Sequence, residues 1–214
     1  MRCLGNLTFV AVGDSNGRLT FEAIVKRTGC VIQNNKFQPG LPHICLAKQA
    51  NFKMYYEIHE MPYHGAIGGV LHKNIFKSPI NILNEIPSKG RYVVFVHIYL
   101  HYTCHHYALF AEEMHRIREA SERALARNSD LRIILRGPHA LTLYEGKGWT
   151  FVGGNDIAVE IYDDIIRKEF EPLKDKVYYI LPWNMTIAIP GNFHPNKFVY
   201  DAISGLILEK LCFS

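Results

Sequence analysis

A serine near the start of the chain and a histidine near its end are the residues whose types and positions suit covalent catalysis. Ser15 follows an apolar run at residues 7–12 that stops abruptly at Gly13 and Asp14. A serine hydroxyl is a poor nucleophile until a base within hydrogen-bond reach takes its proton, and His194 can be that base. We therefore predict that Ser15 is a nucleophile and His194 its general base. The alternative for the Gly-Asp-Ser tripeptide alone is an ordinary turn and helix cap, because Asp and Ser are common in both.

The elements that flank these two residues decide whether they can meet. Residues 7–12 have the composition of a buried strand, and residues 18–27 are expected to form the next helix, with Gly29 as its stop signal. His194 precedes an apolar segment, residues 198–208, that we expect to be a closing helix. In an open α/β sheet the carboxyl ends of the strands and the starts of the following helices form one crevice. A serine after the first strand and a histidine before the last helix can therefore lie side by side.

The rest of the chain alternates strand-like and helix-like segments. Residues 107–127 show apolar side chains at helical spacing, and the apolar run at 91–100 predicts a central parallel strand covered on both faces. Other expected elements are strands at 53–59, 131–135 and 177–181, a helix at 155–170, a loop excursion at 30–52 with room for short strands, and a short helix with a linker at 70–90. This alternation predicts an α/β fold with a mainly parallel sheet and helices on both faces, in one domain spanning residues 1–214.

Composition limits the partners and the compartment. The chain of 214 residues is 48% hydrophobic with a net charge of +4, which is too small and too scattered for a nucleic-acid surface. No apolar run reaches the roughly 18–20 residues that span a bilayer, and the N-terminus is too short for a signal peptide.

Five cysteines leave one unpaired; Cys30 and Cys45 either bridge a loop in an oxidising compartment or remain free buried thiols. The tripeptides at residues 6–8 and 184–186 match the glycosylation sequon of secreted glycoproteins.

Five short motifs occur in an order and spacing that match a known family. They are Gly13-Asp14-Ser15, Tyr63-His64-Gly65, residues 94–103 (VFVHIYLHYT), Arg136-Gly137-Pro138-His139 and Asn192-Phe193-His194-Pro195. Together they resemble the C-terminal domain of the neurexophilin and PC-esterase domain (NXPE) family, within the GDSL/SGNH hydrolase superfamily. Members of that family carry a leader or membrane anchor and an N-terminal neurexophilin-like region. We therefore expect this chain to be the PC-esterase domain alone, as a fragment or a short form.

The resemblance implies a three-layer α/β/α fold of the SGNH hydrolase type and a serine-dependent esterase or O-acetyltransferase acting on the O-acyl groups of glycans. The implied partner is an O-acylated or acceptor glycan or glycoprotein in the secretory pathway, in the Golgi lumen or outside the cell. No cofactor is expected for hydrolysis, whereas a transferase would need an acetyl donor such as acetyl-CoA. We expect neither a nucleic-acid partner nor a membrane span in this chain.

The resemblance and the loop positions also suggest the rest of the site. We expect the oxyanion hole to comprise the backbone N–H groups of Ser15 and Gly65, with help from His101. Residues suggested as substrate contacts are Asp14, Arg18, His64, Arg136, His139 and Asn192. The histidines at 97, 101, 105 and 106 raise the alternative of a zinc site, but the spacing suits ligands on one face of a helix, whereas His97 and His101 are expected on or just beyond a strand. We therefore predict no metal.

One expected catalytic group is missing. In the superfamily a carboxylate typically stands three residues before the histidine, where it orients the ring and stabilises the imidazolium. Here that position is Gly191, followed by Asn192. Three explanations remain open: another carboxylate or a backbone carbonyl orients His194; the oxyanion hole and the acceptor sugar suffice for slow acyl transfer; or the domain has become a catalytically inactive module that binds glycan or protein.

Overall fold

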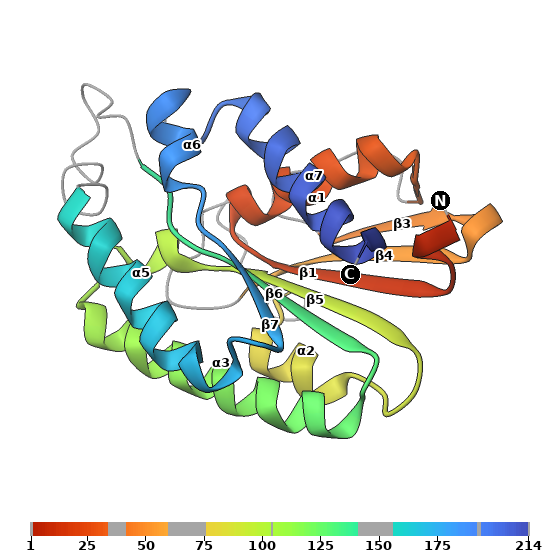
Figure 1. The fold of residues 1–214 in the computed structure, drawn as a ribbon, viewed down its shortest axis with the longest axis horizontal. Coiled ribbons are helices and arrows are strands. Elements are labelled where there is room, and N and C mark those ends of the chain that lie inside the picture. The colour runs from red at the N-terminus through yellow and green to blue at the C-terminus, as the bar shows by residue number, and fades with distance from the viewer. Residues whose placement is uncertain are drawn as a thin grey trace.

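A sheet with helices on both faces forms the centre of the protein (Figure 1). The computed structural model describes residues 2–33, 42–59, 76–103, 105–140, 156–191 and 194–213. Within these ranges the sheet has seven strands in the spatial order β2-β3-β4-β1-β5-β6-β7. Their bounds are β1 (Leu7–Gly13), β2 (Val31–Ile32), β3 (His43–Ala47), β4 (Phe52–Ile58), β5 (Arg91–His97), β6 (Leu131–Arg136) and β7 (Val177–Ile180). Neighbours from β4 to β7 are parallel, and β2 and β3 add antiparallel pairings at one edge, so the predicted mainly parallel sheet is confirmed.

The helices form the outer two layers. One face carries α1 and α7, and the opposite face carries α2, α3 and α5 (Figure 1). Their bounds are α1 (Ser15–Thr28), α2 (Pro79–Glu85), α3 (Tyr107–Arg127), α5 (Asp156–Phe170), α6 (Trp183–Ala188) and α7 (Lys197–Phe213). Single turns of 3-10 helix occur at η1 (Arg2–Leu4), η2 (Lys48–Ala50), η4 (Tyr99–Tyr102) and η5 (Glu171–Leu173). This is the predicted three-layer α/β/α fold.

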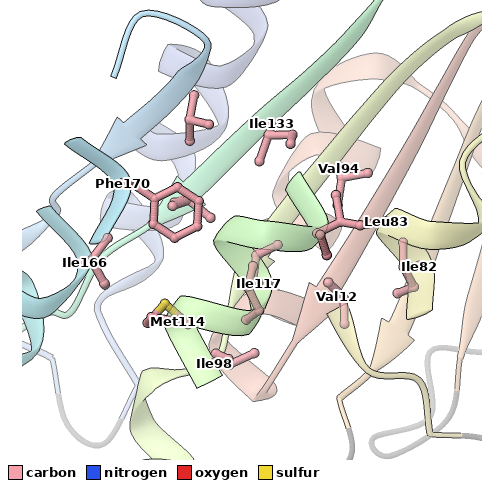
Figure 2. Packing of buried hydrophobic residues seen from close by; sticks show 14 of the residues in the cluster. Val12, Ile82, Leu83, Val94, Ile98, Met114, Ile117, Ile133, Ile166 and Phe170 are labelled. Carbon is pink, nitrogen blue, oxygen red and sulfur yellow. The ribbon is translucent and has the colours of Figure 1, made fainter. Parts of the chain in front are cut away.

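Strand β5 shows why the sheet is covered on both faces. Val93 and Phe95 join the apolar cluster under α1 and α7, whereas Val94 and Val96 join the cluster under α2, α3 and α5. Figure 2 shows the second cluster, in which side chains of α3 such as Ile117 lie over the sheet. A strand buried on both faces must be apolar at successive positions, which is the pattern that predicted it.

The predicted strand at 91–100 ends three residues early. Gly13 of β1 pairs with His97, and on the other side Val96 is the last residue of β5 with a partner in β6. Beyond His97 neither neighbouring strand offers a partner, and the backbone of Ile98 leaves the extended conformation with φ −132° and ψ −2°. The remaining apolar residues are still buried, but in the η4 turn.

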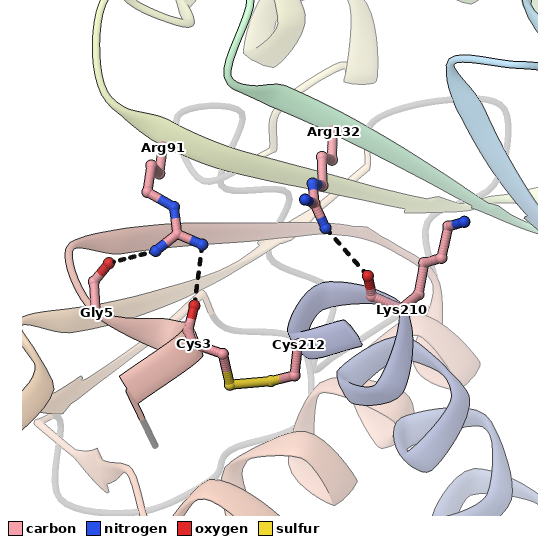
Figure 3. Close-up of a disulfide and its surroundings, with 6 residues drawn as sticks. All are labelled: Cys3, Gly5, Arg91, Arg132, Lys210 and Cys212. Atoms are coloured by element: carbon pink, nitrogen blue, oxygen red, sulfur yellow. Dashed lines mark hydrogen bonds between the residues drawn. A yellow bond between two sulfur atoms is a disulfide. The ribbon is translucent and has the colours of Figure 1, made fainter. Parts of the chain in front are cut away.

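Two disulfides join segments that the sequence could not pair with certainty. Cys30 is bonded to Cys45, and Cys3 is bonded to Cys212 (Figure 3). The guanidinium of Arg91 reinforces the N-terminal side of the second bridge by donating to the carbonyls of Cys3 at 2.9 Å and Gly5 at 2.7 Å. The fifth cysteine lies outside the described residues. Of the two alternatives for Cys30 and Cys45, the structure has the disulfide.

Other boundaries differ locally from the predictions. Helix α1 begins at Ser15 rather than at residue 18, because Asp14 caps it. Strand β4 begins one residue earlier than predicted, and α6 was not predicted. None of the helices in the described ranges combines the length and the apolar character needed to cross a membrane.

Candidate active site

The turn between β1 and α1 is built around a glycine. A Cβ atom on Gly13 would collide with the carbonyl oxygen of His97, because the ends of β1 and β5 approach closely at this point. The same carbonyl accepts the N–H of Asp14 at 3.1 Å. The hydroxyl of Tyr56 in β4 lies 3.0 Å from each of the carbonyl oxygens of Gly13 and Asp14. The residue after Asp14 is thus presented at the carboxyl edge of the sheet by contacts from both neighbouring strands.

Asp14 caps α1, as one interpretation of the sequence held. Its carboxylate Oδ1 accepts the N–H groups of Asn16 at 2.8 Å and Gly17 at 3.2 Å. The N–H of Ser15 has no acceptor among the described residues. It is therefore available, beside the Ser15 hydroxyl, to a negatively charged oxygen at the helix N-terminus.

Ser15 and His194 lie in direct contact. The Nε2 atom of His194 is 2.9 Å from the Oγ atom of Ser15, although 179 positions separate the two residues. An unprotonated Nε2 accepts the hydroxyl hydrogen at this distance, which is the geometry required of a general base. His194 is half-buried, and so is Ser15.

Packing between α1 and α7 produces this contact. The two helices share an apolar cluster that includes Phe21 and Ile24 of α1 and Ile203 of α7. At the start of α7 the hydroxyl of Tyr200 donates to Oδ1 of Asn16 at 2.6 Å. Ser15 is the first residue of α1, and His194 lies three residues before α7, so packing of the helices side by side brings the two together.

The electrostatic surroundings favour a neutral His194. Burial lowers the pKa of its imidazole from the ordinary 6.5; the negative charge of Asp14 opposes this effect and the positive charge of Arg18 adds to it. Arg18 lies in the first turn of α1 and forms an ion pair with Glu22. At neutral pH the ring can therefore accept a proton, and the imidazolium formed by proton transfer gains stabilisation from the Asp14 carboxylate.

Gly191, at the position where the superfamily places an acid, has no space for a side chain. A Cβ atom there would collide with the carbonyl oxygen of His194 and would lie 2.6 Å from the backbone nitrogen of Asn196. The backbone at residue 191 therefore leaves no room for the acid that the superfamily places there. Asp14 contributes negative charge near His194, but its Oδ1 is engaged in the helix cap.

A buried cation lies beneath the first turn of α1. Arg136 is only 2% exposed, and its Nη1 donates to the carbonyl of Asn16 at 3.0 Å and to the hydroxyl of Thr20 at 2.9 Å. Its guanidinium lies 5.3 Å from the ring centre of Tyr200, and its own carbonyl bonds to Nδ1 of His97 at 3.0 Å. These contacts connect β5, β6, α1 and α7 directly below Ser15.

Burial changes the interpretation of three suggested substrate contacts. The side chains of Arg136, His139 and Asp14 are 2%, 0% and 1% exposed. In this structure these side chains are enclosed by the protein, and a direct contact with substrate remains a prediction for all three. Arg18 is partly exposed and can still meet one.

Other predicted site residues remain predictions. His101 lies in η4 with its ring 4.5 Å from that of His59, centre to centre. His64, Gly65 and Asn192 lie outside the described residues, so their positions relative to Ser15 are not part of this structure. Among the described residues there is no group of three His, Cys, Asp or Glu side chains that could hold a metal ion.

Sequence reasoning missed several residues that shape the site. Asn16, Thr20 and Tyr200 are buried and bonded to one another or to Arg136. One signal was available: a polar residue in the buried face of an otherwise apolar helix, such as Thr20 of α1, usually has a hydrogen-bond partner. The sequence does not identify that partner.

The fold and the serine at the end of its central strand define the class of protein: an α/β/α fold of the SGNH hydrolase type. Residues 1–212 match the family model described as "NXPE family member 4-like, C-terminal domain", and the chain belongs to the NXPE family. The predicted family membership is thereby confirmed.

Solved structures show a similar fold at low sequence identity. A carbohydrate esterase family 3 protein from Talaromyces cellulolyticus is 15% identical with a TM-score of 0.51, over 95% of this chain and 96% of that one. A mutant acetyl esterase crystallised with an acetate ion is 13% identical with a TM-score of 0.49, over 96% of this chain and 95% of that one. A search of curated proteins gives no match.

Proposed function

We propose that this protein is a serine-dependent acyl esterase or O-acyltransferase that acts on O-acyl groups of glycans, with Ser15 as the nucleophile and His194 as the base. The observation that carries the proposal is the 2.9 Å contact between Ser15 Oγ and His194 Nε2. The fold neighbour from Talaromyces cellulolyticus is described as a carbohydrate esterase, which is the substrate class proposed here.

The proposed reaction begins with attack by Ser15 Oγ on the carbonyl carbon of an acetyl ester while His194 Nε2 takes the hydroxyl proton. In this proposal the N–H of Ser15 stabilises the oxyanion that forms, together with the donors suggested at Gly65 and His101. His194 then gives the proton to the departing sugar oxygen as the C–O bond breaks, leaving an acyl-serine. Water releases the acyl group in hydrolysis, and a second sugar hydroxyl takes it in transfer.

We propose that no resident cofactor takes part. In transfer, the acyl group that loads Ser15 would come from a donor such as acetyl-CoA. Two disulfides support a location in the secretory pathway, where glycans carry such groups.

The second candidate is a catalytically inactive domain that binds glycan or protein. The turn at Gly191 favours it, because no side chain can be placed there and the usual acid is thus missing. In the esterase proposal the Asp14 charge partly replaces that acid, since it raises the pKa of His194 against the effect of burial.

Labelling with a fluorophosphonate separates the two candidates. We expect the folded 214-residue chain to be labelled at Ser15, with no labelling in Ser15→Ala and strongly reduced labelling in His194→Ala. Ser88→Ala is the matched control, because Ser88 is an exposed loop serine. Turnover of 4-nitrophenyl acetate should follow the same order. A folded chain that is not labelled at any pH from 5 to 9 would instead establish the inactive module.

A further inference from the structure

A cavity of about 250 Å³ lies between α2 and α3, at the carboxyl ends of β4 and β5. Its floor and walls combine polar groups with apolar side chains. The lining residues that matter here are His59, Asn81, Ile98, Tyr102, Glu113 and Arg116. None of them is used by the catalytic steps described above.

The cavity adjoins the Ser15 turn through two of its lining residues. The N–H of His59 lies 3.4 Å from the carbonyl oxygen of Gly13, two residues before Ser15. Ile98 directly follows His97, whose carbonyl accepts the Asp14 N–H at 3.1 Å. These residues come immediately after the strands on either side of β1. The cavity and the Ser15 turn therefore lie at the same edge of the sheet.

His101 provides a second connection. Its ring packs on the ring of His59, with centres 4.5 Å apart. The suggested oxyanion residue therefore contacts the wall of the cavity. A group bound in the cavity would lie next to the region where an ester carbonyl is expected.

The charges in the cavity are balanced. Glu113 and Arg116 approach to 3.5 Å, with the carboxylate side chain 17% exposed and the guanidinium side chain 58% exposed. Burial raises the pKa of the Glu113 carboxyl, and Arg116 counteracts this effect. The pair presents acceptors and donors together, beside the Asn81 amide, which offers both. Pro79, Ile80, Ile98 and Tyr102 add apolar groups to the lining, although Ile98 and Tyr102 are only 3% and 4% exposed.

We propose that this cavity binds one neutral pyranose ring of the glycan whose acyl group reacts at Ser15, an inference that rests on the proposed function. Sugar hydroxyls donate and accept, which suits the Glu113–Arg116 pair and Asn81, while the C–H groups of the ring meet the apolar part of the lining, which includes Ile80. The volume is below the roughly 300–1,000 Å³ of sites for drug-sized ligands, so a single ring fits better than a nucleotide-bearing donor. Because Glu113 and Arg116 balance each other, the pair offers no net positive charge to attract an anionic sugar.

The test measures sugar binding with catalysis disabled. Methyl 6-O-acetyl-glucopyranoside, its galacto and manno epimers, and the corresponding N-acetylated glycosides are titrated into the 214-residue Ser15→Ala chain and followed by ligand-observed NMR. We expect at least one to bind saturably, and Glu113→Gln or Arg116→Gln added to Ser15→Ala to weaken that binding about tenfold, as loss of a hydrogen bond to a charged group does. Glu119→Gln and Arg123→Gln are the matched controls on exposed positions of α3 and should leave binding unchanged.

The outcomes separate this inference from the proposed function. Saturable binding that Glu113→Gln weakens, in a chain whose Ser15 is not labelled by fluorophosphonate, supports the cavity and overturns catalysis. Labelling of Ser15 without binding of any of these sugars, or binding that none of the cavity variants alters, overturns the cavity and leaves the proposed function standing. With active protein, the cavity variants should raise KM for the bound acetylated sugar, whereas Glu119→Gln and Arg123→Gln should leave it unchanged.

Discussion

Ser15 lies above buried polar groups contributed by four elements, whereas His194 lies in the turn before α7. Beneath Ser15, Tyr56, His97, Arg136 and Tyr200 contact the backbone or the Asn16 side chain of the β1–α1 turn. His194 is half-buried, and its neighbour at the acid position is a glycine with no space for a side chain. The position of the nucleophile is therefore built into the core, whereas that of the base depends on the packing of one helix.

Because of this difference between the two residues, we expect substitutions near them to affect stability and catalysis in different proportions. Changes beneath Ser15 should destabilise the fold and reduce activity together, because the same contacts serve both. Changes at His194 should reduce activity with little effect on stability.

The largest expected effect is on catalysis by His194→Ala. We expect kcat/KM for 4-nitrophenyl acetate to fall about 10²–10⁴-fold, the usual contribution of a general base. The melting temperature should change little, since the ring is half-buried. A variant that melts many degrees lower while retaining activity would reverse the contrast between the two residues.

Arg136→Met tests the buried support. Its removal takes one donor from the Asn16 carbonyl, which keeps the Thr20 hydroxyl as a donor, and takes the Arg136 donor from the Thr20 oxygen; we expect the free energy of unfolding to fall by about 1–3 kcal/mol. Denaturant unfolding monitored by fluorescence measures this change. Arg132→Met is the control from the same strand: its Nη1 bonds to the Lys210 carbonyl at an exposed position (Figure 3), and it should cost about 0.5 kcal/mol or less. Equal losses in the two variants would contradict a special role for Arg136.

Gly191→Asp asks whether the missing acid can be restored. The new side chain meets the backbone of His194 and Asn196, so we expect a loss of about 1–3 kcal/mol in stability and no gain in activity. Gly205→Ala in α7 is the control, because a Cβ there has ordinary contacts of 3.8 Å or more, and it should be neutral or stabilising. An active, equally stable Gly191→Asp protein would show that the turn can adapt.

The smallest effect is expected in the pH profile. Because burial lowers the pKa of His194 below 6.5, the rising limb of kcat/KM should lie below pH 6.5. The unfolded chain binds this proton more readily than the folded chain does, so His194 also makes stability decrease as pH falls below about 6.5. Arg18→Gln removes a charge that lowers this pKa and should move the limb to higher pH. Lys26→Gln, at the exposed far end of α1, should not move it.

The sequence predicted the elements best where one physical pattern dominates. Helix 107–127 was predicted with the bounds observed, because its apolar spacing is regular and its caps are polar. The strand before Ser15 and the strand at 131–135 were recognised because buried parallel strands are continuously apolar. The meeting of Ser15 with His194 followed from both lying at element ends on one edge of the sheet.

The apolar patterns of the sequence do not predict the direction in which a side chain points or which distant residues form contacts. Arg136 is at the end of an apolar strand. From that position its side chain could point into the crevice or lie beneath α1, and the sequence does not distinguish the two. Tyr200 and Asn16 are 184 positions apart, and neither residue type alone indicates the other. The Cys3–Cys212 bridge was equally hidden, since five cysteines allow many pairings.

The bridge between Cys3 and Cys212 makes the polypeptide a covalent ring over nearly its whole length. A single protease cut anywhere between those cysteines opens the ring but releases no fragment. Ser15 and His194 would therefore remain on one covalently joined molecule after such a nick, and their separation would need thiol reduction or a second cut as well.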